Sequence, residues 1–97
     1  MLSDMDCRSL AEQCLARMAQ QCGEDLVLID RPFETPATLA YTYQTSDFVA
    51  TGDFTHALVG NGPILVSKVT GTVEVAGTAL PVEDYVREFE AKNARSA

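Results

Sequence analysis

The sequence predicts one α+β domain, with a small antiparallel sheet of about four strands between an N-terminal amphipathic helix and a C-terminal helix. Two patterns carry this prediction. Apolar residues recur at three- and four-residue steps in residues 7–22 and again in residues 82–89, which is typical of helices lying on a core. Between them, residues 39–44 and 72–76 alternate with the period of two of a half-buried strand. At 97 residues the chain can form one core, so we expect a single domain over residues 1–97.

The first helix has both of its end signals in the sequence. Ser3 is a good N-cap, Asp6 completes a capping-box pair with it, and Gly23 is suited to end the helix in a left-handed conformation. The helix is expected to lie against one face of the sheet. Its apolar stripe, with Leu15 at the margin, contains Cys7, Leu10, Ala11, Cys14, Met18 and Cys22.

Two strands are expected after this helix. Residues 26–29 favour β-structure, and Pro32 and Pro36 are expected to keep the following residues in a loop. Residues 39–44 then form the second strand. Residues 46–60 are too apolar for a bare loop, so we expect an ordered connection, with a helical turn over residues 53–58 as one option.

A glycine-rich corner ends this connection. Gly60 and Gly62 can adopt positive φ, Asn61 tolerates the left-handed region, and Pro63 fixes its own φ. We expect this corner to be structural, because it leads into a strand and lacks the following lysine and helix of a phosphate-binding loop.

A β-hairpin is predicted over residues 64–76, with Gly71 at the special position of its turn. Two registers are open. A two-residue turn would pair Val66 with Val75, whereas a type I turn with a bulge at Gly71 would pair Leu65 with Val75. In both cases Val73 and Val75 are expected to face inward.

The C-terminal helix is expected to begin near Pro81, because proline suits the first helical position and Glu83 and Asp84 suit the first turn. We expect both helices on one face of the sheet, with the other face partly free. The apolar stripe of this helix contains Val82, Tyr85, Val86 and Phe89.

The order of these motifs resembles the YrhB-like immunity-protein family of bacterial polymorphic toxin systems. The resemblance extends over residues 39–90 and includes the GDF, ALVGNGP, TG, GTALP and VEDYVREFE segments that begin at residues 52, 57, 70, 77 and 82. It implies a protein that binds a cognate toxin inside the producing cell and occludes its active site or substrate groove, without turnover. Two alternatives remain open: a chaperone-like protein that binds apolar surfaces of various clients, and an enzyme.

The net charge of −7 is concentrated in the middle of the chain, where residues 18–86 carry nine acids against Arg31 and Lys68. Such a surface repels nucleic acid and favours a basic protein partner, although acidic surfaces also serve solubility. The sequence has no apolar run long enough to span a membrane, and its first six residues lack the pattern of a secretory signal. We therefore expect a cytoplasmic protein that does not bind membranes.

The connecting segment supplies the candidate toxin-binding residues. Asp47 and Asp53 carry charge there, and Phe48 and Phe54 offer aromatic area, a combination typical of protein-interface hot spots. The competing interpretation is that both phenylalanines belong to the core and both aspartates cap turns.

The sequence offers little support for catalysis or for a cofactor. Cys7, Cys14 and Cys22 lie too far apart along one helix to form a disulfide, and we expect reduced, mostly buried thiols. The cysteine spacing does not match a zinc site, and His56 is the only histidine. The enzyme alternative rests on Cys7, near a helix N-terminus, together with His56. We therefore expect no metal and no cofactor.

Overall fold

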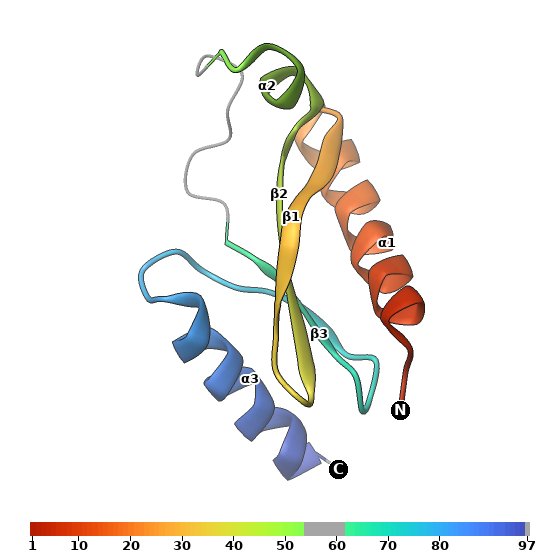
Figure 1. Cartoon of the computed structure of the whole chain (residues 1–97), viewed down its shortest axis with the longest axis vertical. Coiled ribbons are helices and arrows are strands. Elements are labelled where there is room, and N and C mark those ends of the chain that lie inside the picture. Colours follow the sequence, from red (N-terminus) through yellow and green to blue (C-terminus); the bar gives the residue numbers. More distant parts are fainter. Residues whose placement is uncertain (54–61, 97) are drawn as a thin grey trace.

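The computed structural model describes residues 1–53 and 62–96, and for residues 30 and 94–96 it describes the backbone alone. It confirms the α+β class (Figure 1). The helix that contains residues 46–51 was expected only as an ordered connection. In chain order the elements are α1 (Asp4–Cys22), β1 (Leu26–Glu34), β2 (Thr38–Thr45), α2 (Ser46–Thr51), β3 (Ile64–Ser67), β4 (Val73–Val75) and α3 (Val82–Ser96).

Helix α1 begins and ends as its sequence predicts. The Ser3 hydroxyl accepts a hydrogen bond from the Asp6 amide, and the Asp6 carboxylate accepts one from the Ser3 amide, each at 3.1 Å. Gly23 ends the helix at φ 73°. Cys22 is exposed, so the expectation that the thiols are mostly buried holds for Cys7 and Cys14 alone. Eight residues turn a helix about 80° past two full turns, which carries Cys22 away from the stripe that Cys14 joins.

The strands form one antiparallel sheet in the order β1-β2-β3-β4. The prediction that a loop follows residue 29 is wrong, because β1 continues to Glu34 and pairs Phe33 with Ala40. The register shifts between Ile29 and Phe33. Pro32 lies in this irregular part of an outer strand, where a missing N–H breaks no ladder hydrogen bond.

The two long helices cover opposite faces of the sheet, which corrects the prediction that both lie on one face (Figure 1). Leu39 of β2 packs in the cluster formed with α1, whereas its neighbour Ala40 packs against α3. Successive strand residues point to opposite faces, so the buried run Ile64–Ser67 also contributes to both clusters. Strands with apolar residues at consecutive positions need cover on both sides.

The β3–β4 hairpin has neither of the two predicted registers. Val75 pairs with Ile64, and Val66 pairs with Val73. The turn is longer than predicted, since the Ser67 amide donates to the Thr72 carbonyl at 2.9 Å. Gly71 does occupy a special position, at φ 77°. Val75 was expected to face inward but is 44% exposed, because β4 is an outer strand.

At the predicted glycine corner, Gly62 is crowded by a neighbouring backbone but does not have the expected positive φ. Gly62 is absent from the described glycines with positive φ, which are Gly23, Gly52 and Gly71. Its backbone passes against Ala76, the residue after β4, where an added Cβ would lie 1.8 Å from the Ala76 carbonyl oxygen. Beside it, the Pro63 carbonyl accepts a hydrogen bond from the Ala76 amide at 2.8 Å. Gly60 and Asn61 lie outside the described residues.

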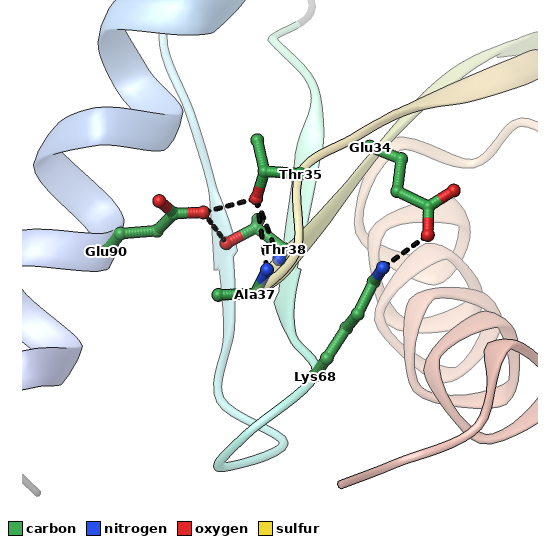
Figure 2. Close-up of polar contacts among 6 residues, drawn as sticks. All are labelled: Glu34, Thr35, Ala37, Thr38, Lys68 and Glu90. Carbon is green, nitrogen blue, oxygen red and sulfur yellow. Dashed lines mark hydrogen bonds and ion pairs between the residues drawn. The ribbon is translucent and has the colours of Figure 1, made fainter.

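Helix α3 is held by its predicted apolar stripe and by one carboxylate. Val86 and Phe89 are buried against β2 and β3. The Glu90 carboxylate accepts hydrogen bonds from the hydroxyls of Thr35, at 2.5 Å, and Thr38, at 2.6 Å, and so ties α3 to the turn between β1 and β2 (Figure 2). Nearby, the buried ammonium of Lys68 pairs with Glu34.

Candidate protein-binding surface

Three of the four predicted contact residues, Asp47, Phe48 and Asp53, lie on or just after α2, a helix built from local hydrogen bonds. The Thr45 hydroxyl caps it by accepting from the Phe48 amide at 3.1 Å. Gly52 ends it at φ 70° and donates its amide to the Phe48 carbonyl at 2.7 Å. The Thr51 hydroxyl donates to the Asp47 carbonyl and accepts from the Asp53 amide, at 2.7 and 3.1 Å. These bonds fix the positions from which both aspartates project.

The sheet brings a second acidic segment next to this helix. The Ser46 amide donates to the Asp25 carbonyl at 2.9 Å, which extends the pairing of β1 with β2 by one residue. The turn that contains Glu24 and Asp25 therefore lies beside the start of α2, and both side chains are exposed. We call Glu24, Asp25, Asp47 and Asp53 the acidic end.

Four ion pairs between described residues lie on other parts of the structure. Arg8 pairs with Glu12 along α1 at 3.1 Å, and Arg87 pairs with Asp84 along α3 at 3.3 Å. Two further pairs, Lys68 with Glu34 and Lys92 with Glu74, join separate elements. The four residues of the acidic end are exposed, so their charge contributes to the field at this end of the molecule.

The structure brings three of the four predicted contact residues together. Asp47 and Asp53 are exposed, and Asp47 also lies in the first turn of α2, where a carboxylate stabilises the helix dipole. Phe48 is half-buried, while the adjacent Val49 is 54% exposed. Phe54 lies outside the described residues.

Sequence reasoning did not group Glu24 and Asp25 with Asp47. A usable signal was present, because Asp25 directly precedes one predicted strand and Ser46 lies two residues after the end of the next. Antiparallel neighbours place the start of one strand beside the end of the other. The apolar contribution of Val49 was also missed, since nothing in the sequence showed which face of this segment would be covered.

The environment of Cys7 is that of a core thiol. Its side chain is fully buried, and burial, followed by the nearby charge of Asp4, raises the pKa of the thiol. A reactive cysteine has a lowered pKa and access to its substrate. The proposed partner of Cys7, His56, lies outside the described residues.

A metal site requires a cluster of metal-binding side chains, and a membrane span requires a long apolar helix. Within residues 1–53 and 62–96, no three His, Cys, Asp or Glu side chains gather closely enough to hold a metal ion. None of the helices in that part of the chain combines the length and apolar character needed to cross a membrane.

Comparisons with known proteins agree with the resemblance found in the sequence. The chain is 35% identical over 54 residues to the Escherichia coli K12 protein named YrhB, a match that covers 56% of this chain and 57% of YrhB. The shared segment thus spans little more than half of that relative. No solved structure matches the chain. The family model described as Immunity protein 35 matches residues 6–92. The chain therefore belongs to the immunity protein 35 family.

Proposed function

We propose that the protein neutralises a cognate toxin by binding it through the acidic end and covering its active site or substrate groove. Membership of an immunity-protein family supports an immunity function in general. The mechanism proposed is inhibition by binding, without turnover, in the cytoplasm of the cell that makes the toxin. The toxin would belong to a polymorphic toxin system and would present a basic surface to its inhibitor.

One observation carries the choice of surface. The hydrogen bond from Ser46 to Asp25 joins the α1–β1 turn to α2, so acids from two distant parts of the sequence project from one end of the molecule. Phe48 and Val49 add apolar area to the same short helix. Carboxylates around an apolar contact speed the encounter with a basic partner and disfavour wrong partners, while the apolar area supplies desolvated contact.

The charge and the small apolar area of the acidic end also favour one kind of partner over others. Carboxylates repel the phosphates of nucleic acid, so a nucleic-acid partner is not part of the proposal. A chaperone would need a broad exposed apolar face, whereas the apolar contribution of α2 is small and sits among charges. A single basic protein partner fits both features.

The test is to co-express the protein with the product of the adjacent gene, purify the complex and measure association rates by surface plasmon resonance. With Asp47→Lys and Asp53→Lys together, we expect association at low salt to slow by about tenfold or more, because steering contributes factors of 10 to 10³. The difference should shrink at high salt, where screening shortens the range of the field.

A matched control makes the same change in net charge elsewhere. Glu83 and Glu88 are exposed on α3, so Glu83→Lys with Glu88→Lys should slow association much less than the acidic-end variant. Equal association rates for the acidic-end variant and the wild type at low salt would overturn the proposed surface. A neighbouring protein that forms no complex and is no toxin would overturn the proposed function itself.

A further inference from the structure

The outer edge of β1 carries backbone groups that no described strand pairs with, since β1 lies at the end of the sheet. The Ser46 amide bonds to the Asp25 carbonyl, so these two residues form a hydrogen-bonded pair. Hydrogen-bonded and non-hydrogen-bonded pairs alternate along an antiparallel ladder. Leu26 and Leu28 therefore direct their N–H and C=O groups away from β2, toward the open edge.

A groove runs beside this edge, between β1 and α1, and consists of two adjoining cavities that share Arg8. The first, about 340 Å³, has an apolar lining from Leu15 and Ala16 of α1 and from Leu26 and Leu28 of β1. The second, about 300 Å³, lies where the register of β1 shifts, and it is lined by polar and charged groups that include those of Arg31, Glu34 and Tyr41.

Tyr41 gives the second cavity an available hydrogen-bond donor. The residue is only 5% exposed, and burial raises the pKa of its phenol to about 12, so the hydroxyl keeps its proton. No hydrogen bond joins this hydroxyl to another described residue. It retains contact with solvent, because no fully buried polar side-chain atom in the described chain is left without a partner.

We propose that this groove binds an extended segment of a partner protein as an additional strand on β1. The segment's backbone would form hydrogen bonds with the backbone of Leu26 and Leu28. One apolar side chain of the segment would enter the cavity beside Ala16, and one of its oxygens would accept a hydrogen bond from the Tyr41 hydroxyl. Strand addition obtains affinity from backbone hydrogen bonds and specificity from pockets for alternate side chains.

The occupant follows from the chemistry of the groove. Outward N–H and C=O groups at strand spacing require another backbone, which a nucleic acid or a small ion does not supply. The charges that line the two cavities largely offset one another, since the two arginines, Arg8 and Arg31, stand against three carboxylates, those of Asp4, Glu12 and Glu34. A mostly neutral peptide segment with an apolar side chain suits this lining.

The groove and the acidic end are distinct surfaces that adjoin each other. They meet where Leu26, which lines the groove, directly follows Asp25 of the acidic end. A toxin bound at the acidic end could therefore extend a strand along β1. The identification of the partner as the toxin rests on the proposed function, whereas binding of an extended segment does not.

A phage-displayed library of random 12-residue peptides provides the probe, with an enriched peptide then synthesised for measurement. We expect this peptide to slow hydrogen exchange of the Leu26 and Leu28 amides by about tenfold or more. Ala16→Trp should fill the apolar cavity and weaken binding by about tenfold or more, while Gln13→Trp, on an exposed position outside the groove, should leave affinity unchanged. Tyr41→Phe should weaken binding by about three- to tenfold through the lost hydrogen bond.

Three outcomes would overturn the inference: no enriched peptide, protection of amides outside β1, or concentration-dependent protection of β1 by a second copy of the protein alone. The acidic-end variant separates the two proposals. If it binds the peptide normally but associates slowly with the toxin, both proposals are supported. If the peptide fails to bind while toxin association retains its salt dependence, the groove inference falls and the proposed function stands.

Discussion

Gly62 lies so close to Ala76 that a Cβ atom on the glycine would be 1.8 Å from the alanine carbonyl oxygen. This contact brings the chain entering β3 against the end of β4, and the Ala76 amide bonds to the neighbouring Pro63 carbonyl at 2.8 Å. The oxygen belongs to the backbone, so no side-chain movement can relieve a clash there.

We predict that Gly62→Ala lowers the free energy of unfolding by about 3 kcal/mol, at the upper end of the range for overpacking. Gly52→Ala is the matched control, since Gly52 has φ 70° and nothing within 4 Å of an added Cβ. It should cost only about 1 to 2 kcal/mol, the cost of left-handed backbone. Urea denaturation measures both variants. An equal or smaller loss for Gly62→Ala would show that the corner can shift.

The second prediction concerns the attachment of α3. Glu90→Ala leaves the hydroxyls of Thr35 and Thr38 without their acceptor, so we expect the free energy of unfolding to fall by about 1.5 to 3 kcal/mol. Glu88→Ala, an exposed glutamate on the same helix, should change stability by less than about 0.5 kcal/mol.

A double-mutant cycle of Glu90→Ala with Thr38→Val isolates the carboxylate–hydroxyl contact. Groups that bond directly show coupling of about 0.5 kcal/mol or more. Additive effects of the two changes would contradict the role of Glu90 in holding α3 to the β1–β2 turn.

The third prediction concerns alkaline pH. Burial raises the pKa of Tyr41 from 10.0 to about 12, and it also raises the pKa of Tyr43. Between pH 10 and about pH 12, Tyr41 keeps its proton in the folded state and loses it in the unfolded state. The free energy of unfolding therefore falls as pH rises through this window. Below about pH 10 the contribution is fully present.

Tyr41→Phe should therefore flatten the decline of unfolding free energy with pH above about pH 10, with a residual slope from Tyr43. Spectrophotometric titration of tyrosinate in the two proteins should show that the substitution removes a group that ionises near pH 12. If the difference between the two titration curves has its midpoint at the ordinary tyrosine pKa of 10.0, the result would contradict the buried environment of the Tyr41 phenol.

The fourth prediction concerns the thiols. Cys7 and Cys14 are buried and Cys22 is exposed, so Ellman's reagent should label one thiol quickly in the native protein and the other two slowly. Cys22→Ser should remove the fast phase, and all three thiols should react at once in denaturant. Cys14→Ala should leave a small cavity and lower stability while partner binding persists. Rapid labelling of Cys7 would revive the hypothesis that it is a nucleophile.

Local signals in the sequence determined the long elements. The capping pair of Ser3 with Asp6 and the left-handed Gly23 fix both ends of α1 through bonds between near neighbours in the chain. The stripe that includes Val86 and Phe89 identified the face of α3 that is buried. The order of motifs in residues 39–90 indicated the family, and these residues lie within the span 6–92 that the family model matches.

Only the tertiary structure decided how these elements are arranged. Consecutive buried residues such as Leu39 and Ala40 face opposite sides of β2, so the energy of covering both faces placed α1 and α3 on opposite sides. The continuation of β1 past Pro32 depends on its place at the sheet edge, where a proline breaks no ladder bond.

The same distinction holds for the candidate site. Sequence alone indicated Asp47, Phe48 and Asp53, because charge and aromatic area lay close together along the chain. The addition of Glu24 and Asp25 depends on the pairing of β1 with β2, which joins residues about twenty positions apart through the Ser46–Asp25 hydrogen bond. The positions of these residues along the chain become informative only once it is known which strands pair, and the packing of the whole sheet decides that pairing.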